Sequence, residues 1–176
     1  MTYADALVSK PINSSGAGLK GLEFDAVVNS LAFIHPMLSS FGVSGNATLL
    51  SGHLTVPVSP GVNRTVGNLI DQPDNIANAS LFYVQDGLEL RAAYNHEGRS
   101  LRSVLNNIYW QDLYWAPRDQ VDLSATYAFP NGFSIYAQAA NVTQSRIVAL
   151  TGPSKTLLRD DYTIPTTFWF GVRYTL

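Results

Sequence analysis

The chain ends in FWFGVRYTL, residues 168–176, a stretch that alternates between large apolar side chains and smaller or polar ones. The apolar set comprises Phe168, Phe170, Val172, Tyr174 and Leu176. Between these lie Gly171, Arg173 and Thr175, and only Trp169 breaks the pattern. Because successive side chains of a strand point to opposite faces, the stretch predicts a β-strand with one apolar face.

The same alternation surrounds Asp86-Gly87, which predicts a two-residue hairpin. A type I′ turn needs positive φ at both central residues, and this pair tolerates that conformation. The turn sets a register that places Tyr83 opposite Leu90 and Leu81 opposite Ala92. The apolar side chains of both strands then share one face, as a half-buried sheet requires.

A second hairpin is predicted at Pro130, Asn131 and Gly132. A two-residue turn would put the apolar sets of the two strands on opposite faces. A three-residue loop, with Pro and Asn in a type I turn and Gly in the left-handed position, makes them coincide. It places Tyr127 opposite Ile135.

Two further strands are predicted at residues 22–28 and 41–49, which also alternate. A partial strand from Tyr3 to Ile12 is expected first, followed by a turn from Ser14 to Gly18. With the hairpins and the terminal strand, the total is about eight strands.

The connections between these strands differ in length. Those expected to be short lie near residues 13–18, 35–40, 86–87 and 130–132, and those expected to be long and structureless lie near 55–74, 97–117 and 146–164. Long structureless loops count against a compact soluble domain. Short turns at one end and long extracellular loops at the other are typical of outer-membrane β-barrels.

Composition narrows the class of protein. Charged residues make up only 14% of the 176 residues, against about 25% in soluble domains, yet no run of about 20 apolar residues could form a spanning helix. The net charge of −2 and the lack of a Lys/Arg cluster argue against nucleic acid as a partner. The absence of cysteine excludes disulfides and thiolate metal sites.

Several motifs together resemble the carboxy-terminal part of TonB-dependent outer-membrane receptors. They are Leu19–Glu23, Pro73–Asn78, Ser80–Tyr83, Arg91–Asn95, Asp122–Tyr127, Asn141–Thr143 and Gly171–Tyr174. Their order and spacing cover essentially the whole chain. The fold expected from this resemblance is all-β, an antiparallel meander of about eight strands that is the last part of a large transmembrane β-barrel.

The resemblance implies a barrel of about 22 strands with an amino-terminal plug, which takes up siderophores, vitamin B12, carbohydrates or metal complexes. Its expected partners are outer-membrane lipid, the plug, the remaining strands, an unidentified small ligand, and TonB through an amino-terminal part. Residues 1–176 contain neither plug nor TonB box, and Met1–Asp5 does not resemble the start of an export signal. The sequence therefore predicts a partial barrel domain of the cell outer membrane, inactive in transport when alone.

Two other architectures remain open. One is a self-contained eight-stranded outer-membrane barrel with binding or adhesive loops, and the other is a soluble β-sandwich or binding module. A small barrel must fill its interior with side chains. The residues expected to face inward are mostly small, which favours the wall of a wide barrel: Gly21, Asn29, Ser44, Asn46, Thr48, Ser80, Ala93, Ser124 and Thr126.

An aromatic cluster in the 97–117 connection is the candidate ligand site. It comprises Tyr109, Trp110, Tyr114 and Trp115. Such side chains favour the membrane interface, and they also stack on sugars or aromatic siderophores. The sequence therefore leaves two hypotheses open, a place in the interfacial girdle and contact with a ligand.

No catalytic, cofactor or metal residues are predicted, and the chain is not expected to be an enzyme. Residues 16–21 match G-x-G-x-x-G, but an alternating strand follows instead of a helix, so we expect a glycine-rich turn. Glu23 and Asp25 share a strand face, as expected of a hydrated lumen wall. The three histidines, His35, His53 and His96, have no metal-ligand spacing.

Overall fold

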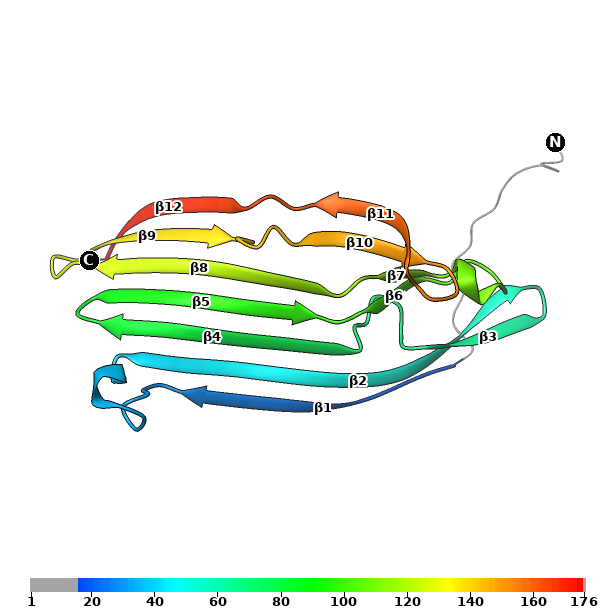
Figure 1. The fold of residues 1–176 in the computed structure, drawn as a ribbon, viewed down its shortest axis with the longest axis horizontal. Coiled ribbons are helices and arrows are strands. Elements are labelled where there is room, and N and C mark those ends of the chain that lie inside the picture. The colour runs from blue at the N-terminus through cyan, green and yellow to red at the C-terminus, as the bar shows by residue number, and fades with distance from the viewer. Residues whose placement is uncertain (1–15, 176) are drawn as a thin grey trace.

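The computed structural model describes residues 16–175, which form two antiparallel β-sheets (Figure 1). The strands that follow one another across the main sheet are β1 (Gly16–Val28), β2 (Phe41–Ser59), β4 (Asn75–Gln85), β5 (Leu88–Glu97), β8 (Arg118–Ala128), β9 (Phe133–Ala140) and β12 (Thr167–Tyr174). This all-β antiparallel meander confirms the predicted fold class. The strand expected from Tyr3 to Ile12 lies outside the described residues.

Both predicted hairpin registers are confirmed. In the β4–β5 pair, Tyr83 faces Leu90, and both turn residues have positive φ, 48° at Asp86 and 82° at Gly87. In the β8–β9 pair, Tyr127 faces Ile135 across the three-residue loop. The turn residues determine these registers because only one loop length brings the apolar side chains to the same face.

The main sheet is a single layer whose apolar face is bare. Large side chains on this face are exposed, among them Leu22, Phe24, Leu81, Leu123, Ile135, Phe168, Phe170 and Val172. Within residues 16–175 the buried hydrophobic residues are only Leu54, Val66, Leu101 and Ala149. A soluble β-sandwich covers such a face with a second sheet. Here the second sheet lies beyond the end of the first (Figure 1).

The expectation of structureless long connections is wrong. Residues 55–74 contain the end of β2 and β3 (Val62–Gly67), which folds back on it. The other two contain the second sheet, in the order β11 (Leu157–Thr163), β10 (Arg146–Thr151), β7 (Leu113–Trp115) and β6 (Ser100–Ser103). The Gly, Pro and Asn residues of these segments are typical of loops, so the short strands between them were not expected from the sequence. The strands form by pairing: β3 pairs with β2, and the four strands of the second sheet pair with one another.

The expected turn at Ser14–Gly18 is also wrong for its described part. Gly16 already lies in β1 and faces Thr55, at the end of the sheet that carries the long connections. A single strand, β1, separates Gly16 and Gly18 from the turn near residues 35–40. These glycines and that turn therefore lie at opposite ends of the main sheet. A Cβ at Gly21 would lie 2.8 Å from the carbonyl oxygen of Leu49, so this glycine allows a close approach of two strands.

The described helices are two short 3-10 turns, η1 (Pro36–Leu38) and η2 (Tyr109–Gln111). No helix in residues 16–175 is long and apolar enough to cross a membrane.

Candidate functional site

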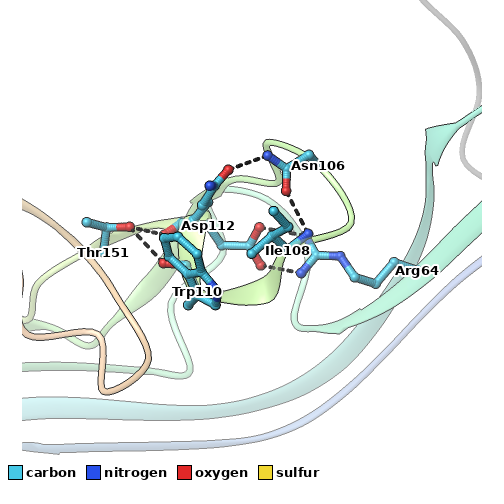
Figure 2. Close-up of polar contacts among 7 residues, drawn as sticks. Arg64, Asn106, Ile108, Trp110, Asp112 and Thr151 are labelled. Atoms are coloured by element: carbon cyan, nitrogen blue, oxygen red, sulfur yellow. Dashed lines mark hydrogen bonds and ion pairs between the residues drawn. The ribbon is translucent and has the colours of Figure 1, made fainter.

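The three long connections, residues 55–74, 97–117 and 146–164, meet in one assembly at a single end of the main sheet, which is called the wall below. An ion pair joins two of these connections (Figure 2). The guanidinium of Arg64, on β3, donates two hydrogen bonds to the carboxylate of Asp112, at 2.9 and 2.6 Å. The side chain of Asp112 is only 2% exposed. A bidentate pair of this kind fixes both distance and orientation.

The third connection is attached to the same segment through Thr151. Its hydroxyl lies 3.2 Å from the carbonyl oxygen of Trp110 and 3.0 Å from that of Asp112. The backbone N–H of Gly152 also donates to the carbonyl of Trp110, at 2.9 Å. The 104–112 segment is therefore held from both sides, by β3 and by the end of β10 (Figure 2).

Bonds within the 104–112 segment shape its tip. Asn106 donates to the side chain of Gln111, and its own carbonyl oxygen accepts from the N–H of Ile108 at 2.6 Å. The N–H of Asp112 donates to the carbonyl of Tyr109 at 3.3 Å, which closes the η2 turn. These bonds make the tip a preorganised structure.

A small apolar core lies beneath this segment. Leu54, Val66 and Leu101 are buried together, and Tyr114 packs against them. The register of β2 is unbroken from residue 43 to 57, so Leu54 shares a face with the polar Ser44 and Asn46. This small apolar core, called the loop core below, therefore lies on the polar side of the wall, opposite the bare apolar face.

The structure divides the four predicted aromatic residues into two pairs. Tyr109 and Trp110 lie on η2 and are 64% and 45% exposed. Tyr114 packs in the loop core, with the ammonium group of Lys155 4.4 Å from its ring centroid. Trp115 donates from its indole N–H to Asp71 at 3.0 Å. The structure thus presents one exposed pair and one packed pair.

The assembly contains the ion pairs Arg64–Asp112, Arg102–Asp160 and Arg146–Asp161. Arg102 lies 4.3 Å from the ring centroid of Trp115 and pairs with Asp160, whose hydrogen bond raises the pKa of the guanidinium. Burial, reinforced by the carboxylate of Asp112, raises the pKa of Tyr114 above its ordinary value of 10.0. The Tyr114 hydroxyl is therefore protonated at neutral pH and adds no charge to the loop core.

The polar face of the wall carries a row of side-chain amides at one level. Asn46 faces Asn78, Asn78 faces Asn95, and Asn95 faces Gln120. Asn78 donates to Asn46 at 2.9 Å, and Gln120 donates to Asp122 at 2.8 Å. Glu23 and Asp25 lie on this face too, because Asp25 faces Asn46. The row offers donors and acceptors to water or to another protein surface.

Sequence reasoning missed the residues that hold the assembly together. Arg64 and Asp112 are 48 positions apart, and neither lies in a recognisable motif. Thr151 is one of many threonines, and its role depends on a carbonyl 41 positions away. No local signal could have indicated these contacts.

Comparison with known proteins gives one match. A family model described as "TonB dependent receptor-like, beta-barrel" matches residues 2–142. No curated protein and no solved structure matches the chain.

Proposed function

Because this chain belongs to the TonB-dependent receptor-like β-barrel family, we propose that it forms the carboxy-terminal part of the wall of an outer-membrane receptor that takes up a small ligand. The family consists of outer-membrane receptors and transporters rather than enzymes. The plug, the remaining strands and TonB are the partners that this function requires. Lipid is the medium that its bare apolar face requires.

The observation that carries the proposal is the single-layer main sheet. One face is apolar and uncovered in residues 16–175, while the other is lined by amides and carboxylates. Such a sheet is unstable in water, because its exposed apolar area is too large for a soluble monomer. It is stable as a wall with lipid on one side and water or a plug on the other.

Cysteine labelling tests this arrangement cleanly, because the chain has no cysteine of its own. Ser80 and Leu81 are neighbours on β4 and face opposite sides. In membranes, a thiol introduced by Leu81→Cys is expected to resist a water-soluble maleimide, and one introduced by Ser80→Cys to react. Equal reactivity at both positions would contradict the proposal.

Tyr109 and Trp110 are the proposed ligand contacts. Their segment is bonded to Arg64, which faces Val56 on the polar side of β2, so the segment is attached on the side of the lumen. This attachment supports ligand contact over a place in the lipid-facing girdle. Flat aromatic rings held on a rigid turn suit stacking on a sugar or an aromatic chelator.

Alanine replacement of Tyr109 or Trp110 in the complete receptor is expected to weaken ligand affinity about tenfold, equivalent to about 1.4 kcal/mol. Tyr162→Ala, an exposed aromatic on β11, is the matched control and should leave affinity unchanged. Ligand contact at η2 is ruled out if both replacements match the control.

A further inference from the structure

The connection between β1 and β2, residues 29–40, differs from the other two turns at its end of the wall. Those turns have two and three residues and contain Asp86-Gly87 and Pro130–Gly132, which suit water. The 29–40 connection has twelve residues, none of them Asp, Glu, Lys or Arg. It exposes large apolar side chains, 76% of Phe33 and 82% of Met37, with Ile34 beside them.

Several polar groups of this loop are hydrogen-bonded within it. Its neck is closed by a hydrogen bond from the N–H of Leu31 to the carbonyl of Phe41, at 2.8 Å. The hydroxyl of Ser30 donates to the carbonyl of Ser39, also at 2.8 Å. Nδ1 of His35 accepts from the N–H of Met37 at 3.2 Å and caps η1. Bare apolar side chains on a loop whose neck and η1 turn are hydrogen-bonded suit the headgroup region, where water is available to the remaining polar groups.

The loop is also continuous with a band of aromatic side chains. Phe41, which follows it, packs against Tyr83 with ring centroids 4.9 Å apart. Two similar pairs occur at the same end of the wall, namely Tyr127 with Phe129 at 4.7 Å and Phe133 with Tyr174 at 4.6 Å. These residues share the apolar face, and such a girdle marks a membrane–water interface. The end with the short turns is the periplasmic end.

We propose that residues 31–38 insert into the headgroup region of the periplasmic leaflet and anchor the wall to phospholipid. Phe33, Ile34 and Met37 are the inserting side chains. The absence of charged side chains removes the main cost of insertion, and the girdle places the loop at the right depth. The inference rests on the proposed function, because it requires the main sheet to stand in a membrane.

Spin labelling of the complete receptor in vesicles of phosphatidylethanolamine and phosphatidylglycerol tests this anchor. One nitroxide is attached at a time, through Met37→Cys, Leu81→Cys or Asn131→Cys. Accessibility to oxygen, which concentrates in lipid, is compared with accessibility to a water-soluble nickel chelate. The ratio of oxygen to nickel accessibility at position 37 is expected to be several-fold above that at 131 and below that at 81.

A second variant measures the contribution of the neighbouring side chains. With the label at position 37, Phe33→Ser together with Ile34→Ser is expected to lower the ratio toward the value at position 131. An unchanged ratio would show that these side chains do not hold the loop in lipid and would overturn the proposal.

The other outcomes distinguish failure of the lipid anchor from failure of the proposed function. If position 81 is in lipid but position 37 resembles 131, the loop is in water and the anchor is disproved while the wall remains. If both reagents are excluded at position 37, the loop is covered by protein, such as a second copy or another domain, and the lipid anchor is again disproved. If position 81 is itself in water, the proposed function fails together with the anchor.

Discussion

The carboxylate of Asp112 is almost inaccessible to solvent, and the guanidinium of Arg64 balances its charge. Removing one partner of a buried pair leaves the other charge uncompensated, which costs about 3–5 kcal/mol. The cost falls mainly on the loop assembly, because the pair joins β3, which is paired only with the end of β2, to the 104–112 segment.

Asp112→Asn is therefore expected to loosen the loops and leave the wall intact. Hydrogen exchange of amides in β3 and the 104–112 segment should accelerate by roughly a hundredfold or more, since about 1.4 kcal/mol corresponds to tenfold. Asp161→Asn is the matched control, because its partner Arg146 is 54% exposed and such pairs contribute about 0–1 kcal/mol. Equal acceleration in both variants would contradict this role for the buried pair.

Asn141 joins the end of β9 to two bends. Its backbone φ is 57°, its amide donates to the carbonyl of Ile164 at 2.8 Å, and its carbonyl oxygen accepts from the N–H of Ser145 at 2.8 Å. Asparagine is one of the few residues that tolerate this conformation while making such bonds.

Replacing Asn141 tests the contributions of its side-chain hydrogen bonds and of its positive φ. Asn141→Gly keeps the positive φ but loses the hydrogen bonds, at a cost of about 1–3 kcal/mol for each buried group left unpaired. Asn141→Ala should cost about 1 kcal/mol more, because alanine is strained at positive φ. The midpoint of urea unfolding of the complete receptor measures the cost of each replacement. Gln144→Ala, at φ 52°, is the control and should be near neutral, since both residues carry a Cβ. An alanine variant as stable as the glycine variant would refute the strain argument.

The β4–β5 hairpin depends on Gly87 for a steric reason. Its φ is 82°, and a Cβ there would lie 2.5 Å from the carbonyl oxygen of Ala128 in the neighbouring strand. Gly87→Ala is therefore expected to destabilise the wall by about 1–3 kcal/mol, whereas Asp86→Asn should change stability by less than about 0.5 kcal/mol. Urea unfolding compares them, and similar midpoints would show that the turn does not require glycine.

Strands and turns differ in how far local sequence predicts them. The hairpin registers were predictable because turn chemistry and period-two alternation act over a few residues. β6, β7, β10 and β11 were not, because each is only three to seven residues long and the sheet they form depends on the pairing of β7 with the distant β10. The four aromatic residues of the candidate ligand site could be located in one connection from the sequence, but their division into exposed and packed pairs depends on contacts with Asp71, Lys155 and the loop core.

The seven strands that follow one another across the main sheet leave two open edges that run in the same direction. β1 and β12 are separated by six antiparallel steps, so they are parallel to each other. The described strands cannot close on themselves with antiparallel pairing, and closure needs an odd number of further strands. Open edges carry unpaired N–H and C=O groups, which are not tolerated in hydrocarbon.

Because the small side chains of the polar face would not fill a closed eight-stranded barrel, residues 1–176 expressed alone are expected to pair edges with other chains or to aggregate. Size-exclusion chromatography in detergent, together with electrophoresis of unheated and heated samples, should show oligomers and no compact monomer. Recovery of a monomeric species whose mobility changes on heating would indicate closure into a small barrel and would contradict this expectation.

Period-two alternation and turn chemistry were enough to establish the all-β class, the order of the wall strands, two hairpin registers and which face of the sheet is apolar. These properties depend on residues close together in the chain, so the amino acids alone specify them. The joining of three loops through Arg64, Asp112 and Thr151, and the apolar loop at residues 29–40, became apparent only in the folded chain. They depend on which distant groups meet and on which side chains remain uncovered after all strands have paired.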